Sequence, residues 1–216
     1  MVLAPWLRVF KRSALDVTLT TRAGLSTRII EKPGATLDDA ALEKLVDQLR
    51  QVAARALSKG ALTYGVFSGE RERLSQTIVT LVSDTATGRP IAFNALALME
   101  ARLNGEPLQI MHLGLVMVDP DYRGQGLSDA LYGLTVLFLF IRGGLRPRWL
   151  SNVSQVPAVI GMVSETFSNV FPSPGSRQSF SHLTLARQIM RRHRHVFGVG
   201  DEAGFDEKRL LAERSG

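Results

Sequence analysis

The feature that most constrains this chain is an apolar run that stops at Pro120 and leads through two glycines into a long helical pattern. The helical pattern covers residues 127–142, and Gly124 and Gly126 precede it. The first amides of a helix have no partner within the helix, and the helix dipole is positive at that end. Such a loop favours an anion, because glycine lets the anion approach the backbone closely. Arg123 would add a charge-assisted contact. We therefore expect a phosphate-binding loop at Arg123, Gly124, Gln125, Gly126, Leu127 and Ser128.

Two better-known phosphate loops do not fit this stretch. A P-loop would end in Gly-Lys-Ser or Gly-Lys-Thr, and neither ending is present here. The dinucleotide fingerprint requires a third glycine at the position that Asp129 occupies. The preceding segments also predict antiparallel strands, whereas a dinucleotide-binding fold is built from parallel βαβ units.

The residues before the loop predict a strand and a helix. Residues 25–31 favour a strand, and Thr36 is the expected N-cap of the following helix. Asp38 and Asp39 fall in its first turn, where the helix dipole favours negative charge, and residues 59–60 supply a stop. The apolar positions form a helical stripe made of Leu42, Leu45, Val46, Leu49, Val52 and Ala53.

Three strands are expected next, over residues 76–83, 91–99 and 109–118. The turns between them fall at residues 87–90 and 104–105. Short turns between strands make hairpins, so the three strands are predicted to run antiparallel.

After the loop, the pattern predicts two helices around a short strand. The helix over residues 127–142 is apolar nearly all round, so we expect both its sides to be covered, by the C-terminal segment or by a second copy in a homodimer. A strand is expected over residues 148–153 and a helix over 154–168. A loop over 172–181 then leads to a basic helix over 182–197 and a loose tail.

Composition bounds the partners and the compartment. The net charge of +6 and the pI of about 10.2 favour an anionic partner. The absence of cysteine excludes disulfides, thiolate nucleophiles and cysteine-based metal sites, and we expect no metal. The longest apolar stretch, residues 131–141, is too short to span a bilayer, and the first residues do not resemble a signal peptide. We therefore expect a cytoplasmic protein.

From the order of predicted elements and the distribution of charge, we expect a basic arm (residues 1–24), a folded domain (25–171) and a basic C-terminal segment, a helix and a tail (172–216). The arm could form a strand, or a helix that lies on a membrane surface or on a partner, but we favour an extension that packs on the domain. The basic run 188–195 suits a nucleic acid or a membrane surface, but it has no aromatic stacking residue before Phe197. We therefore favour a solvated helix face and expect no nucleic acid.

The loop Arg123-Gly124-Gln125-Gly126-Leu127-Ser128 resembles motif A of the GNAT superfamily of acyl-CoA-dependent N-acetyltransferases, Arg/Gln-x-x-Gly-x-Gly/Ala, with Ser128 in the last small position. Val116-Met117-Val118-Asp119-Pro120 is also similar to the family's strand before that loop. The order of predicted elements over residues 25–171 resembles the family's fold. The resemblance implies an α/β (α+β) fold, in which helices flank a mixed, mostly antiparallel central sheet.

The same resemblance implies a cofactor site. Amides of the loop would hold the pyrophosphate of acetyl-CoA or another acyl-CoA, and the backbone of Met117 and Val118 would pair with the pantetheine like an added strand. Asn152 and Ser154, after the next strand, would bind the pantetheine or the amine acceptor. They serve equally well as caps of the next helix.

Family chemistry is direct attack of a neutral amine on the thioester, with the oxyanion held by a backbone amide, here that of Val118. His112, six residues earlier, is a candidate base, although a histidine that only packs in the sheet fits too. Glu100 and a water chain are the other candidates. The family's leaving-group acid is a tyrosine, which falls at Met162, and methionine cannot donate a proton. A thiolate is a tolerable leaving group, so a water could suffice.

The missing tyrosine leaves a second hypothesis open, a domain that binds acyl-CoA without turnover. The sequence does not specify the acceptor or the acyl length, because acceptor residues vary freely within a shared fold.

Overall fold

The computed structural model describes residues 14–21, 24–57, 65–154 and 157–213. Six strands form one sheet in chain order. The first four run antiparallel, β4 and β5 form a hairpin, and β6 is parallel to β5, so the predicted mixed, mostly antiparallel sheet is confirmed. The strands are β1 (Asp16–Thr20), β2 (Leu25–Glu31), β3 (Thr77–Asp84), β4 (Pro90–Leu103), β5 (Glu106–Val118) and β6 (Trp149–Ser151).

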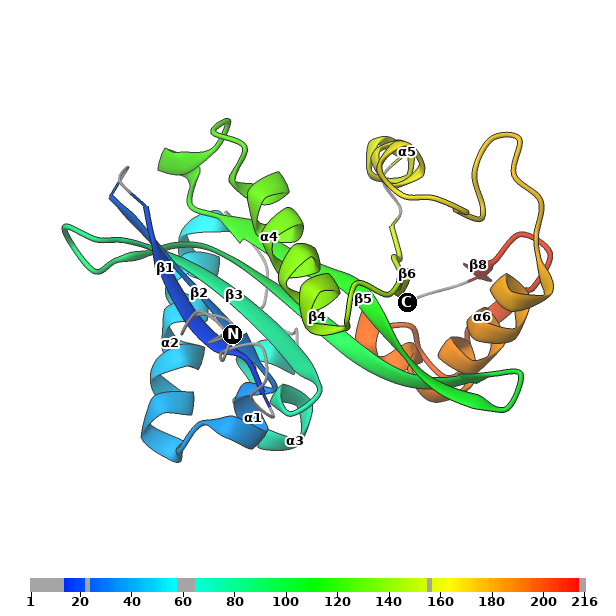
Figure 1. Ribbon diagram of the computed structural model, residues 1–216, viewed down its shortest axis with the longest axis horizontal. Coiled ribbons are helices and arrows are strands. Elements are labelled where there is room, and N and C mark those ends of the chain that lie inside the picture. Colours follow the sequence, from blue (N-terminus) through cyan, green and yellow to red (C-terminus); the bar gives the residue numbers. More distant parts are fainter. Residues whose placement is uncertain (1–13, 22–23, 58–64, 155–156, 214–216) are drawn as a thin grey trace, which may run out of the picture. The chain divides into compact units, whose positions relative to one another are not determined.

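Helices and turns connect the strands in the predicted order (Figure 1). The α-helices are α1 (Pro33–Thr36), α2 (Asp39–Ala56), α3 (Arg71–Leu74), α4 (Leu127–Arg142), α5 (Pro157–Thr166) and α6 (Phe180–Arg192). The 3-10 turns are η2 (Gly65–Phe67), η3 (Pro120–Tyr122) and η4 (Arg194–Phe197), and a separate hairpin pairs β7 (Gly204–Asp206) with β8 (Leu211–Glu213). Among the described residues, none of the helices combines the length and the apolar character that crossing a bilayer requires.

The chain forms two compact units that share strands β4 and β5. Unit 1 contains Met1–Leu98 and Leu113–Arg148, and unit 2 contains Met99–His112 and Trp149–Gly216. These boundaries follow the packing of the chain, whereas the division predicted at residues 24 and 171 comes from the sequence and stays a prediction. The described part of the predicted N-terminal arm includes β1, which pairs with β2. Residues 1–13 of the arm lie outside the described residues.

In unit 1, α2 and α4 cover opposite faces of the strands (Figure 1). Successive residues of β5 alternate between these faces, as strand geometry requires. Leu115 and Met117 belong to the cluster beneath α2, whereas Val116 and Val118 pack on the α4 side. The end of β5 is therefore held between two helical layers.

Helix α2 carries the predicted apolar stripe, and all six of its residues are buried. Its N-cap is Asp38 and not Thr36: the Asp38 side chain accepts a hydrogen bond from the Ala41 amide at 2.8 Å. The hydroxyl of Thr36 instead donates to the carbonyl of Lys32, because residues 33–36 form a separate turn, α1. The helix ends at Ala56, and the predicted stop at residues 59–60 lies outside the described residues.

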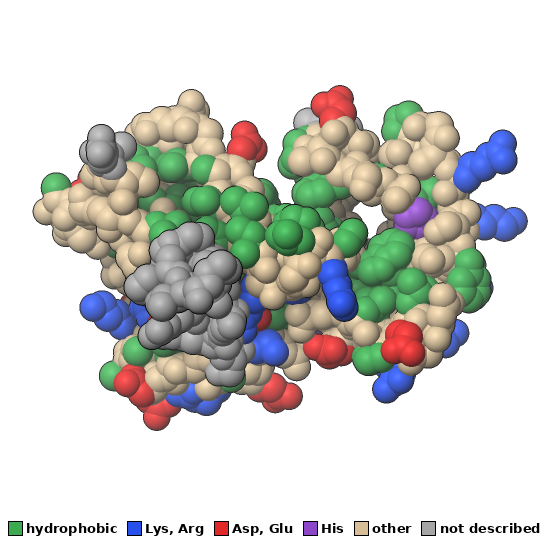
Figure 2. All heavy atoms as spheres, in the orientation of Figure 1, with side chains coloured by type: hydrophobic (Ala, Val, Ile, Leu, Met, Phe, Trp, Pro, Cys, Tyr) green, Lys and Arg blue, Asp and Glu red, His purple; other side chains and the backbone are tan. Residues whose placement is uncertain are grey.

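Helix α4 spans the predicted residues 127–142, and Leu131, Thr135 and Leu139 are buried against the sheet. Its opposite side was expected to be covered as well. Within the described residues this side is open: Leu137 is 50% exposed, Phe140 and Ile141 are also exposed, and Figure 2 shows apolar side chains gathered over α4. Cover by a second copy stays a prediction.

In unit 2, α6 packs on the far ends of β4 and β5, where Leu185 contacts a cluster with Met99 and Ile110. The predicted helix over 182–197 is in fact α6, capped by Ser179, followed by the separate turn η4. The predicted loose tail is ordered where it is described, because it contains the β7–β8 hairpin. Arg187 also forms a bidentate ion pair with Glu207 of that segment.

Candidate active site

The predicted phosphate loop joins η3 to α4. Gly124 and Gly126 adopt the left-handed region, with φ of 74° and 70°, which glycine allows at little cost. A Cβ at either position would meet no described atom within 4 Å, so the space beside both glycines is open. Gly126 is the N-cap of the 16-residue helix α4, and no described side chain caps its first turn. The start of α4 therefore faces open space with its amides uncovered.

The loop amides are not all equivalent. Those of Gly124–Ser128 donate no hydrogen bond to any residue that the structure describes. The Arg123 amide donates to the carbonyl of Pro120 at 3.3 Å, and its guanidinium donates to the carbonyl of Ala56, at the end of α2, at 3.0 Å. An anion would therefore meet the amides from Gly124 onward, whereas Arg123 ties the loop to α2.

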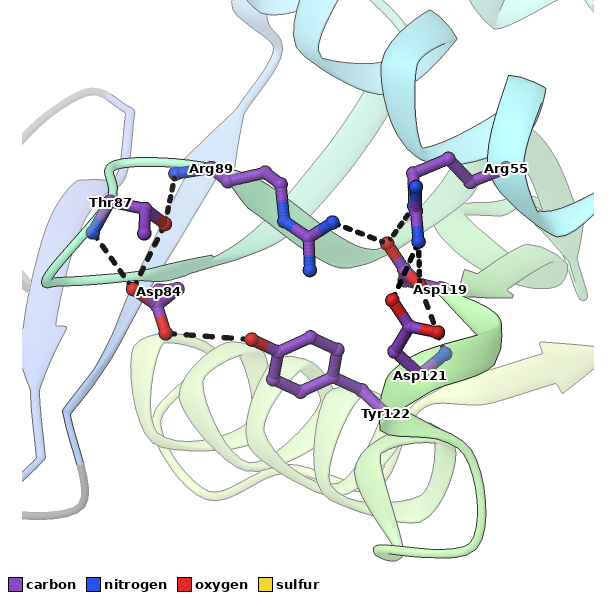
Figure 3. Close-up of polar contacts among 7 residues, drawn as sticks. All are labelled: Arg55, Asp84, Thr87, Arg89, Asp119, Asp121 and Tyr122. Carbon is purple, nitrogen blue, oxygen red and sulfur yellow. Dashed lines mark hydrogen bonds and ion pairs between the residues drawn. The ribbon is translucent and has the colours of Figure 1, made fainter.

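A buried aspartate, Asp119, anchors the residues that lead into the loop (Figure 3). Asp119 is fully buried, and its carboxylate accepts hydrogen bonds from Arg55 and from the Asp121 amide at 3.0 Å. Arg55, from the last turn of α2, also pairs with Asp121 at 2.6 Å, and Arg89 lies 3.5 Å from Asp119. Hydrogen bonding from Arg55 lowers the pKa of Asp119, although burial opposes it, so the carboxylate stays charged at neutral pH.

The turn between β3 and β4 supports the same segment (Figure 3). Asp84 accepts hydrogen bonds from the Thr87 amide and hydroxyl, which lower the pKa of Asp84. Arg89 of this turn lies over the ring of Tyr122, 5.6 Å from its centroid. The residues that precede the glycines are thus fixed by side chains from α2 and from the β3–β4 turn.

The strand that would pair with pantetheine leads directly into this loop. Met117 is 8% exposed beneath α2, so its side chain belongs to the core. The Asp119 amide donates to the carbonyl of Ile91 at 2.8 Å, which keeps the end of β5 attached to β4. Pairing of pantetheine with Met117 and Val118 stays a prediction.

His112 lies in unit 2 and is 4% exposed. Its Nδ1 is 3.0 Å from the hydroxyl of Ser151, which is its register partner on the parallel strand β6. The ring also packs against Phe197 of η4, with centroids 5.4 Å apart. Burial lowers the pKa of His112 to about 4, so the imidazole is neutral at pH 7 but holds a proton only weakly.

No protein-family model matches the sequence, and no curated protein sequence matches it. Several solved structures have a similar fold. A predicted acetyltransferase with acetyl-CoA from Clostridium acetobutylicum is 11% identical, with a TM-score of 0.47 over 78% of this chain and 99% of that one. Glucosamine-6-phosphate N-acetyltransferase from Arabidopsis thaliana is 16% identical, with a TM-score of 0.42 over 72% and 98%. AAC(6')-Iy, in complex with a CoA bisubstrate analogue, is 15% identical, with a TM-score of 0.46 over 72% and 98%.

At such low sequence identities the similarity concerns the fold alone. The order of strands and helices along the chain then decides which fold this is. Strand β2 and helix α2 are followed by the meander β3–β5, the glycine loop, α4, β6 and α5, as the GNAT resemblance predicts. The chain has a GNAT-like fold. The expected fold class is therefore confirmed, whereas the roles of individual residues are not decided by it.

Within this GNAT-like fold, the predicted site residues fall in both units. The loop and the strand end before it belong to unit 1, and His112, Asn152 and Ser154 belong to unit 2. Asn152 and Ser154 follow β6, are partly exposed and each have partners. Glu100, the second candidate base, is exposed and accepts a hydrogen bond from Gln109 at 2.9 Å.

Three features of the site were not predicted from the sequence. Ser151 is the partner of His112, the Arg55–Asp119 contact anchors the loop, and Tyr132 of α4 reaches a carbonyl of β5. Each joins residues that are distant in sequence, and only the strand register or the helix docking brings them together. Only the Arg55–Asp119 contact had a local signal in the sequence, because Asp119 is an acidic residue at the end of an apolar strand.

Proposed function

We propose that this chain is an acyl-CoA-dependent N-acyltransferase of the GNAT superfamily, most simply an N-acetyltransferase. The observation that carries the proposal is the set of unbonded amides at Gly124–Ser128, which stand at the start of a long helix beside open space. Backbone amides at a helix start suit a diphosphate, and coenzyme A carries one.

The binding roles follow from the elements around that helix start. The amides from Gly124 to Ser128 hold the pyrophosphate, and the backbone of Met117 and Val118 pairs with the amides of the pantetheine arm. A backbone amide of β5 beside the acyl end of the arm is the proposed donor to the thioester oxygen, where negative charge develops during attack. Similar proteins are described with acetyl-CoA and with a CoA bisubstrate analogue, which supports a CoA-type co-substrate here.

The chemical step is a direct transfer. The amine nitrogen forms a bond to the acyl carbon, the C–S bond breaks, and coenzyme A leaves as a thiolate while the amine loses a proton. His112 is the proposed proton acceptor, because it is neutral at pH 7. Its low pKa means that it would pass the proton on at once. Asn152 and Ser154 are proposed to orient the pantetheine or the acceptor.

Titration calorimetry with coenzyme A tests the binding site. We expect G124A/G126A to weaken the affinity at least tenfold, because each added Cβ projects into the open space beside the loop and both positions have a positive φ that alanine rarely adopts. Gly105→Ala is the matched control: Gly105 also has positive φ, 83°, and open space, but it lies in the β4–β5 turn. If the double variant folds and binds coenzyme A as tightly as the control does, the proposed loop function is wrong.

A second candidate function is binding of acyl-CoA without turnover. Two observations favour it: Met162 occupies the position of the expected tyrosine, and His112 is a weak base. Release of thiol from acetyl-CoA in the presence of candidate amines separates the two functions. Tight binding of coenzyme A with no thiol release from any amine would favour the binding domain.

A further inference from the structure

A tyrosine of α4 reaches the backbone of the strand that leads to the phosphate loop. The Tyr132 hydroxyl donates to the carbonyl of Gly114 on β5 at 2.9 Å. Both residues belong to unit 1, as does the loop itself. The ring is partly buried, and desolvation raises the pKa of Tyr132, so its phenol keeps its proton at neutral pH.

Gly114 lies on a part of β5 that has an open edge. Strand β6 pairs with β5 at Ile110–His112. From Leu113 to Val118, no described strand pairs with the edge of β5 that faces away from β4. The proposed function places the pantetheine arm on such an edge, with its diphosphate end at the loop.

The spacing along β5 brings the reactive end of that arm to Gly114. Four residues of extended strand, from Val118 back to Gly114, span about 13 Å. This length is comparable to an extended pantetheine arm. A cofactor whose diphosphate sits at Gly124–Ser128 would therefore carry its sulfur toward the Gly114 end, where the Tyr132 hydroxyl lies.

We infer that the Tyr132 hydroxyl contacts the sulfur of the bound coenzyme A and is the proton donor to the leaving thiolate. This inference rests on the proposed function. As the C–S bond breaks, its electron pair moves to sulfur, the Tyr132 hydroxyl turns from the Gly114 carbonyl and gives its proton to the thiolate, and the tyrosinate takes a proton back from solvent. Tyr132 supplies from α4 the donor that Met162 cannot supply from α5.

The test compares two ligands that differ only at the sulfur: coenzyme A, and desulfo-coenzyme A, in which hydrogen replaces the thiol. By calorimetry we expect the wild-type chain to bind coenzyme A about fivefold more tightly, the effect of one hydrogen bond. In Tyr132→Phe, which keeps the ring, we expect the two affinities to be equal. Leu137→Ala, an exposed change on the same helix, should keep the wild-type preference.

The outcomes separate this inference from the proposed function. A wild-type chain that binds neither ligand would overturn the proposed function, and Tyr132 would then have no sulfur to contact. Wild-type binding of both ligands with the same preference in Tyr132→Phe would overturn only the role of Tyr132. Loss of the preference in Leu137→Ala as well would also overturn it, because the effect would then come from any disturbance of α4.

Discussion

The phosphate loop and the His112–Ser151 pair differ in whether their hydrogen-bonding groups remain available to a ligand. In the loop, the amides of Gly124–Ser128 have no partner in the described chain and face open space. In the pair, His112 is 4% exposed and its Nδ1 already lies 3.0 Å from the hydroxyl of Ser151. The loop amides can therefore still donate hydrogen bonds to a ligand, whereas His112 already uses one of its two ring nitrogens in a contact inside the protein.

This difference teaches that binding at the loop and proton transfer at His112 would respond differently to substitutions and to pH. A site made of backbone amides depends on the shape of the loop and has no titrating group of its own. A site made of a buried imidazole depends on desolvation, and desolvation ties it to both stability and pH. Changes at the pair should therefore alter the stability of the fold, and changes around the loop should alter affinity for coenzyme A.

The largest effect is expected from the pH dependence of stability at His112. Its pKa is about 4 in the folded chain and about 6.5 when unfolded, so the unfolded state takes up the proton first as pH falls. This stabilising contribution is fully present above pH 6.5 and is lost as pH falls toward 4. We expect it to lower the free energy of unfolding by about 3 kcal/mol between pH 7 and pH 4.

Urea unfolding of the wild-type chain and of His112→Gln at several pH values measures this contribution. Glutamine does not titrate and still offers a polar group to Ser151, so the variant should lack the extra loss of stability between pH 6.5 and 4. His195→Gln replaces an exposed ring and should keep the wild-type curve. Parallel curves for the wild-type chain and His112→Gln would show that burial of His112 does not control its protonation.

On the loop side, Asp119→Asn should weaken binding of coenzyme A by about tenfold, or about 1.4 kcal/mol. The variant keeps the shape of the side chain but loses the charged contacts to Arg55 and Arg89, which fix the residues before the glycines. Calorimetry gives the affinity, and Asp16→Asn, which breaks the Arg28–Asp16 ion pair on β1, is the matched control.

An increase in the affinity of Asp119→Asn for coenzyme A, instead of the expected decrease, would change the interpretation. Neutralising Asp119 removes a negative charge near the proposed diphosphate site and releases two arginines. Tighter binding in Asp119→Asn would mean that Arg55 and Arg89 act on the ligand directly, and that positioning of the loop by Asp119 is unimportant.

The sequence predicted the loop side of the comparison well, because its determinants are local. Gly124 and Gly126 lie next to a strong helical pattern, and α4 has the predicted bounds. Local reasoning failed where two neighbouring turns compete. Asp38 and not Thr36 caps α2, because the Thr36 hydroxyl is used within the preceding turn, α1.

The pair was only half predicted, because its second member depends on strand register. His112 could be proposed from its chemistry, but Ser151 lies 39 residues away and meets it only through the parallel pairing of β5 with β6. A buried environment cannot be read from one residue either, so the low pKa of His112 was not foreseen. The C-terminal hairpin was missed for the same reason, since Glu207 gains its partner Arg187 through folding.

The smallest effect is expected at Ser151, and it sharpens the comparison most directly. Ser151→Ala leaves the Nδ1 of a buried imidazole without its partner, which should lower the free energy of unfolding by about 1 kcal/mol at pH 7. Ser164→Ala, which removes an exposed hydroxyl from α5, is the control and should cost less. Urea unfolding measures both variants, and calorimetry with coenzyme A should show binding retained in Ser151→Ala. If Ser151→Ala is as stable as the control but loses affinity for coenzyme A, the hydroxyl serves the ligand and not the imidazole. The assignment of binding to the loop and of internal pairing to His112 would then have to be revised.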